Sequence, residues 1–183
     1  MEVNFKHTAP GKPEPIYIEQ VFAEVPGGGI VANPSFDVPP TTAVGVKDGH
    51  FTVIKAFVLL VAVTALDSTI SIKKGSGIVV GDVIGVGKKA VACTKVDTSD
   101  PEKDVVTVTL GVEAAEGQVL YEAKEASENS AEPILKPLYI TGNWLYANEG
   151  DQPVRLINGA NVRKETANLA SEVAALLPMI TLV

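Results

Sequence analysis

Short runs rich in Val, Ile and Thr, separated by Gly, Asp and Ser, dominate the chain from residue 49 to residue 123. Runs of this length and composition are typical of consecutive β-strands, and the residues between them form turns. In the run 105–110 two sets of residues alternate, as expected for a strand with one buried face: Val105, Thr107 and Thr109 against Val106, Val108 and Leu110. The pattern predicts a mainly β protein built on a small β-barrel or sandwich.

We place the strands of this central domain, residues 51–123, near 51–63, 68–72, 83–86, 89–97, 105–110 and 119–122. The first run is also compatible with a buried helix, because apolar content does not separate the two, but its valines and threonines favour a strand. Residues 97–102 read as a turn, since Asp and Ser bond the local backbone and Pro101 presets its φ angle. We therefore expect a hairpin over 89–110.

Residues 1–50 hold seven of the twelve prolines, together with a run of three glycines at 27–29. Proline removes backbone donors and glycine adds conformational entropy, so long regular elements are disfavoured in this region. We expect an extended Pro/Gly-rich N-terminal arm with a short strand near 16–25.

The C-terminal part begins after a polar, linker-like segment at 124–133. In residues 134–183 we expect further strands near 134–140, 144–146 and 154–156, and a turn at Asn158 and Gly159. A C-terminal helix follows over 162–177, with Asn161 as its N-cap and Pro178 after its end.

The predicted helix carries apolar or small residues at spacings of 4, 3, 4, 3 and 4, which is the heptad alternation. A helix of this length is marginal alone in water, so its apolar stripe has to be buried. Two interpretations stay open: the stripe packs on the chain's own barrel, or it forms an oligomer seam. The candidate seam residues are Val162, Thr166, Leu169, Val173 and Leu176.

Composition excludes several classes of function. The chain has 22 acidic and 15 basic side chains, a net charge of -7, so no basic stripe is available for nucleic acid. The single cysteine, Cys93, rules out an internal disulfide, and the sequence has no metal-ligand cysteine cluster. We also expect no secretory signal and no membrane span, because the most apolar run is shorter than about 20 residues.

Two loops resemble binding motifs only in part. Residues 81–89 are glycine-rich like a phosphate loop, but five residues separate Gly81 from Gly87 and Lys89 replaces the required hydroxyl. A turn between two strands explains them better. The acidic residues of 97–104 lack the glycine and glutamate of a calcium-binding EF-hand loop, which favours a solvated hairpin turn.

No combination of residues points to catalysis, a metal or a cofactor, and we expect the protein not to be an enzyme. His7 and His50 have no nucleophile nearby in sequence, and Cys93 reads as a small buried hydrophobic residue. Three aromatic side chains either line a carbohydrate or partner site or pack a core or interface: Tyr139, Trp144 and Tyr146.

Residues 116–124 resemble the hairpin of biotinyl and lipoyl carrier domains, with Lys124 at the position of the modified lysine. The methionines that usually flank a biotinyl lysine are absent. The alternative function is a carrier domain, or a β-domain that binds a small ligand or a carbohydrate.

Two stretches carry a second resemblance. The central one includes VGDVI at 80–84, residues 90–99 and 104–110, and GQVLYEA at 117–123; the C-terminal one is NEGDQPVRLINGANVRKET at 148–166. Both are similar to tailed-phage head-fibre and head-decoration proteins. The resemblance implies a virion structural protein made in the host cytoplasm and located on the capsid exterior. It also implies a homotrimer bound to the major capsid protein, with no active site.

Overall fold

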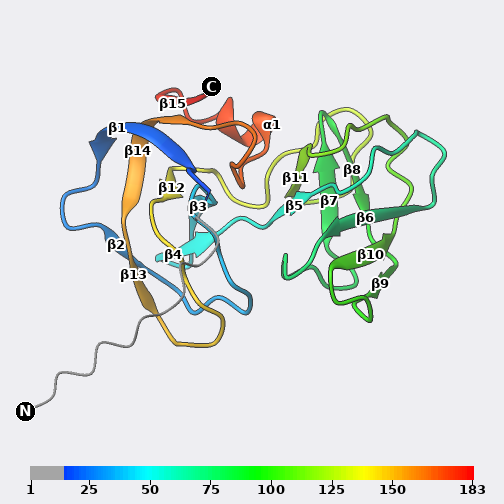
Figure 1. The fold of residues 1–183 in the computed structure, drawn as a ribbon, viewed down its shortest axis with the longest axis horizontal. Coiled ribbons are helices and arrows are strands. Elements are labelled where there is room, and N and C mark those ends of the chain that lie inside the picture. The colour runs from blue at the N-terminus through cyan, green and yellow to red at the C-terminus, as the bar shows by residue number, and fades with distance from the viewer. Residues whose placement is uncertain (1–14) are drawn as a thin grey trace, which may run out of the picture.

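The computed structural model describes residues 15–183, which form two β lobes side by side (Figure 1). The barrel lobe consists of residues 15–54 and 134–183, and the inserted lobe consists of residues 55–133 between them. The chain thus crosses from one lobe to the other twice. The mainly β class that the sequence predicts is confirmed.

The barrel lobe is built on an eight-stranded sheet. Its strands are β1 (Ile18–Glu24), β2 (Gly29–Val31), β3 (Ala43–Lys47), β4 (His50–Val53), β12 (Tyr139–Thr141), β13 (Gln152–Val154), β14 (Leu156–Val162) and β15 (Ile180–Leu182). The order is β1-β14-β12-β3-β4-β2-β13, with β15 parallel to β14. Only Arg155 separates β13, the last strand of this order, from β14, the second strand, so the sheet curls into a partial barrel.

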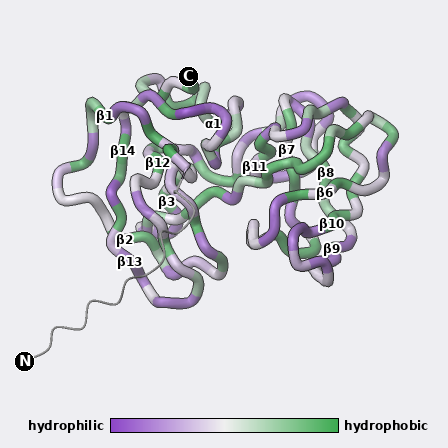
Figure 2. Tube along the Cα trace, viewed as in Figure 1, coloured by the Kyte–Doolittle hydropathy of each residue, from purple (hydrophilic) through white to green (hydrophobic). Residues whose placement is uncertain are grey.

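The inserted lobe combines a three-stranded sheet, β6-β10-β9, with a four-stranded sheet, β5-β11-β7-β8. Its strands are β5 (Ala56–Val58), β6 (Thr69–Lys73), β7 (Val83–Val86), β8 (Lys89–Ala92), β9 (Lys95–Asp97), β10 (Lys103–Thr107) and β11 (Val119–Glu122). The alternation expected over 105–110 is confirmed, because Val106, Val108 and Leu110 are buried while Thr109 is exposed. Figure 2 shows β11 as mostly hydrophobic and the turn beside β9 as hydrophilic.

The hairpin expected over 89–110 is narrower than predicted. β9 and β10 pair antiparallel around the acidic turn, whereas β8 pairs with β7 instead. The glycine-rich segment 81–89 is the β7–β8 hairpin, with Gly87 at φ 59°, so the turn interpretation is confirmed.

The predicted N-terminal arm is wrong for the part of it that the structure describes. Residues 1–14 lie outside the described residues, but 15–50 supply β1 to β3 and the first residue of β4. The strand expected at 16–25 is confirmed as β1. The prolines occupy the connections between strands, and Gly29 lets β2 pass within contact of Leu156, so these residues shape the sheet instead of preventing it.

The segment 124–133 is likewise not a free linker. Ser127 and Ala90 exchange two backbone hydrogen bonds of 2.9 and 2.7 Å, and Lys124 N–H donates to the Glu132 carbonyl at 3.0 Å. The segment lies along β8, and its polar composition reflects exposure to solvent.

The long C-terminal helix is wrong. Residues 156–162 are β14, which pairs with β1, β12 and β15, and the only helical turn in the described residues is α1 (Ser171–Ala174). The turn expected at Asn158 and Gly159 is also wrong, because Gly159 lies inside β14 against Phe22 of β1. Backbone pairing on both sides of β14 outweighs the local preference for a turn.

The residues of the predicted heptad seam therefore do not lie on one helix. Val162, Leu169 and Val173 are buried in the chain's own core, Thr166 is partly buried, and Leu176 is 52% exposed. Most residues at this spacing of three and four face inward, but they lie in succession on a strand, an irregular segment and one helical turn, and Leu176 faces outward.

Two aspartate substitutions test the burial of this segment that the structure shows. We expect Val173→Asp to lower the free energy of unfolding by more than about 3 kcal/mol, because it loses an apolar side chain and buries a carboxylate. Ala175→Asp, two residues along at an exposed position, should cost about 1 kcal/mol or less. Urea denaturation of both variants measures this, and equal costs would contradict the fold of this segment.

Candidate functional site

The two lobes meet over a shared hydrophobic core. One cluster of buried residues includes Leu169 and Val173 from the barrel lobe and Ala90, Tyr121 and Ala123 from the inserted lobe. Interfaces between domains of one chain are often polar and mobile, whereas a common core fixes the lobes relative to each other. The junction is therefore part of the fold and a rigid place to build a site.

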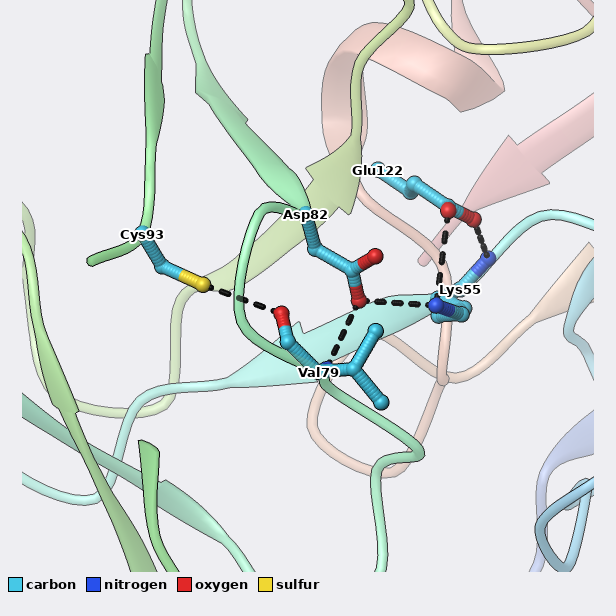
Figure 3. Close-up of polar contacts among 5 residues, drawn as sticks. All are labelled: Lys55, Val79, Asp82, Cys93 and Glu122. Atoms are coloured by element: carbon cyan, nitrogen blue, oxygen red, sulfur yellow. Dashed lines mark hydrogen bonds and ion pairs between the residues drawn. The ribbon is translucent and has the colours of Figure 1, made fainter. Parts of the chain in front are cut away.

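A charged cluster lies where the chain crosses between the lobes (Figure 3). The Lys55 ammonium is 2.7 Å from Oδ2 of Asp82 and 3.5 Å from Oε1 of Glu122. The three side chains are 18%, 11% and 12% exposed, respectively. The backbones of Lys55 and Glu122 are also bonded, since Glu122 N–H donates to the Lys55 carbonyl at 2.9 Å. The cluster thus joins the outgoing chain to the returning strand.

Asp82 connects this cluster to the segments on either side of the β7–β8 hairpin. Its Oδ2 accepts the Val79 N–H at 2.9 Å, and its carbonyl accepts the Cys93 N–H at 2.9 Å. The Cys93 thiol donates to the Val79 carbonyl at 3.1 Å (Figure 3). Cys93 is buried, so its predicted packing role is confirmed.

A second polar contact joins α1 to the β7–β8 hairpin. Oε1 of Glu172 accepts the Gly87 N–H at 2.7 Å, and the Tyr121 hydroxyl donates to the Gly87 carbonyl at 3.1 Å. The Tyr121 ring packs over Gly85, where a side chain would collide with it. Burial, with the nearby Glu172 carboxylate as a smaller cause, raises the pKa of Tyr121 above its usual value of 10.0.

Between the lobes lies a cleft of about 250 Å³, which we call the interlobe cleft. It is lined by Phe36, Asp37, Pro39, Ala56, Val58, Lys73, Lys74, Gly75, Ser76, Trp144 and Asn168. Both lobes contribute, so the cleft exists only because the inserted lobe is held against the barrel lobe. It combines two aromatic rings with several polar groups, a composition typical of small-ligand sites.

Of the three aromatic residues singled out in the sequence, only Trp144 lines the interlobe cleft. The Trp144 ring makes an edge contact with Tyr17, with 6.2 Å between ring centroids. Tyr139 instead makes an edge contact with Phe51, and neither Tyr139 nor Tyr146 lines the interlobe cleft. The structure does not gather the three rings into one site.

The other candidates from the sequence lie apart from the junction. His50 is exposed at the start of β4, and His7 is outside the described residues. Lys124 is exposed at the start of the segment that follows β11. In the acidic turn, Asp97 accepts the Ser99 hydroxyl at 2.7 Å and its N–H at 3.0 Å, and these hydrogen bonds lower the pKa of Asp97.

Within residues 15–183, no group of three or more His, Cys, Asp or Glu side chains is placed to hold a metal ion. No helix in the same residues is long and apolar enough to cross a membrane.

Comparison with known proteins identifies no relative of this chain. No family model matches the chain, and neither the curated proteins nor the solved structures include a significant match.

Sequence reasoning missed the interlobe cleft almost completely. Asp37, Ser76 and Asn168 are far apart in the chain and belong to no motif. The only local signal was Trp144, the single tryptophan of the sequence, next to apolar residues of a predicted strand.

Removing the central cation of the junction should destabilise the protein. We expect Lys55→Met to lower the free energy of unfolding by about 2–3 kcal/mol, because Asp82 and Glu122 are then left close together and largely desolvated. Lys89→Met is the control, since its partner Glu128 is mostly exposed and the pair contributes about 1 kcal/mol or less.

Thermal denaturation of Lys55→Met and Lys89→Met measures this difference. A loss for Lys55→Met equal to that for Lys89→Met would show that the cluster does not stabilise the fold.

Tyr121 should make stability fall at high pH. Unfolded tyrosine ionises near pH 10, and Tyr121 does so only at higher pH in the folded protein. Below pH 10 both states keep the proton and its contribution is complete; above it the unfolded state ionises first, so the free energy of unfolding falls.

Tyr121→Phe removes this contribution to the pH dependence. At about pH 7 the variant should be about 1 kcal/mol less stable, because one hydrogen bond is lost. From about pH 9 to about pH 11 its stability should fall less steeply than that of the wild type. Urea denaturation across this range measures both slopes, and parallel slopes would contradict the assignment.

Proposed function

We propose that this chain is a virion structural protein that decorates a tailed-phage head, through self-association and binding to the major capsid protein. The proposal begins with the resemblance of segments within 80–123, and of residues 148–166, to head-fibre and head-decoration proteins. The observation that supports it further is that both stretches contribute buried residues to the same hydrophobic cluster.

The two resembling stretches contribute to one hydrophobic core. Ala90, Tyr121 and Ala123 come from the first, Ile157 and Ala160 come from the second, and all five belong to the same buried cluster. Residues from separate parts of the sequence that share a core form one structural unit. The shared core supports attributing the resemblance of both stretches to a single domain of one type of protein.

The surface offers apolar side chains for self-association. Leu176, Met179 and Val183 are 52%, 49% and 49% exposed within one short segment, which we call the C-terminal apolar patch. Several large apolar side chains exposed within one segment favour an interaction surface. Leu176 is the one residue of the predicted seam that belongs to the patch. Because Val162, Leu169 and Val173 are buried, we propose the patch as the contact between copies in place of the predicted seam.

Self-association can be tested by light-scattering mass. We expect a trimer, with about three times the 19.2 kDa mass of one chain. The double variant Leu176→Glu with Met179→Glu should give a smaller species, because charges on the patch oppose its burial. Tyr146→Glu, which changes an exposed side chain elsewhere, is the control. A monomeric wild type would overturn this part of the proposal.

Capsid decoration is tested on virions from a culture whose phage encodes this chain. After density-gradient purification we expect the chain in the virion fraction, and antibodies against it should label the heads in electron microscopy. Labelled tails, or a chain found only in the soluble fraction, would contradict the proposal. The same material tests the carrier alternative, because intact mass would reveal a biotinyl or lipoyl adduct on Lys124.

A further inference from the structure

We propose that the interlobe cleft binds a carbohydrate, with one sugar ring held between Trp144 and Phe36. This inference does not depend on the proposed role in a virion. It begins from the size of the cleft: about 250 Å³ is slightly below the range of about 300–1,000 Å³ for drug-sized ligands. That volume suits a single ring with substituents extending into solvent.

The aromatic walls are fixed before any ligand arrives. The Trp144 indole is held by its edge contact with Tyr17, at an interplanar angle of 85°, and the next residue, Leu145, bridges to Val38. The Phe36 ring rests on Gly77, where a side chain would displace it. Rigid aromatic faces suit the C–H-bearing face of a pyranose, which is apolar, and cost little conformational entropy on binding.

The polar groups of the interlobe cleft have unused hydrogen-bonding capacity. The Ser76 hydroxyl oxygen is buried and has no hydrogen-bond partner within residues 15–183. Buried polar atoms of this kind are uncommon, because each costs about 1–3 kcal/mol while it lacks a partner. Ser76 lines the interlobe cleft, and rotation about its Cα–Cβ bond turns the hydroxyl toward a ligand, to which it can donate and from which it can accept a hydrogen bond.

Two further side chains each leave one oxygen available. Oδ1 of Asp37 accepts the Ala147 N–H at 2.9 Å, and its Oδ2 accepts no hydrogen bond from the described residues. Asn168 donates its backbone N–H to Thr41 and its Nδ2 to Thr42, both at 2.8 Å, which fixes its amide and leaves Oδ1 as an acceptor. Two acceptors beside a hydroxyl match the several O–H donors of a sugar ring.

The charges favour a neutral ligand. The Lys74 ammonium is occupied by Asp104 at 2.8 Å and by the Thr98 carbonyl at 2.6 Å. Lys73 is exposed and Asp37 carries the opposite charge, so the interlobe cleft has no concentrated field. A phosphate or nucleotide requires several free cations or oriented N–H groups, whereas a hydroxyl-rich ring requires neither.

The test uses Trp144 as its own reporter, because it is the only tryptophan in the chain. The full-length protein is titrated with glucose, galactose, mannose and N-acetylglucosamine at millimolar concentrations, and with inorganic phosphate as the comparison. We expect a saturable change in tryptophan emission with at least one sugar. Saturation-transfer NMR with the same sugars identifies which ring protons contact the protein.

Two variants examine the polar contacts. Ser76→Ala breaks no hydrogen bond of the folded chain and should weaken the binding of that sugar about five- to tenfold. Asp37→Asn keeps the acceptor for Ala147 but converts the free oxygen into a donor, and should weaken binding by a similar factor. Tyr146→Ala, which changes an exposed aromatic ring outside the interlobe cleft, should leave binding unchanged.

Three results would overturn the proposal. The first is the absence of both an emission change and a saturation-transfer signal for every sugar. The second is sugar binding that neither Ser76→Ala nor Asp37→Asn weakens, which would place the ligand elsewhere. The third is a saturable response to phosphate alone, which would contradict the charge argument.

Discussion

Lys55 lies where the chain leaves the barrel lobe, and the carbonyl of Glu122, at the end of β11, accepts the N–H of Ile134, where the chain returns, at 2.9 Å. The Lys55 ammonium contacts Glu122 and Asp82 at the same time, and the backbone of Glu122 is bonded to that of Lys55. Both crossings are therefore held at one point. A lysine this close to burial is stabilising only while its carboxylate partners are present, so the cluster fixes the edge of the inserted lobe that faces the barrel lobe, and the shared core then sets how the lobes meet.

The shared core and the interlobe cleft both depend on that arrangement. Tyr121 packs on Gly85 within the inserted lobe while its cluster includes Leu169 and Val173 of the barrel lobe. The same contact brings Ser76 and Val58 opposite Trp144 and Asn168. Neither lobe contains the interlobe cleft alone. A ligand site at the boundary between two packed units is a common location, because side chains from both can converge there.

Local patterns predicted the inserted lobe well and the barrel lobe poorly. β7 and β11 have the expected bounds. The Val, Thr and Leu residues of 105–110 were sufficient to predict the alternation of inward and outward side chains through the end of β10 and the residues after it. β7 pairs with β8 and β10 pairs with β9 across short turns, whereas β11, which pairs with β5 and β7, is marked by its own apolar run. In the barrel lobe, β1 pairs with β14 from the other end of the chain, and the Asn158-Gly159 signal was misleading because pairing on both sides keeps that segment extended.

The amino-acid sequence is sufficient for the mainly β class, for most strands of the inserted lobe and for Val162, Leu169 and Val173 as inward positions near the C-terminus, because each follows from local alternation and apolar spacing. It does not show whether those inward positions belong to a helix or a strand, since spacings of three and four residues also occur in a bent, irregular segment. Only the tertiary structure places Asp37, Ser76, Trp144 and Asn168 around one cleft. Their proximity results from long-range pairing and from the contact between the lobes, which local patterns do not encode.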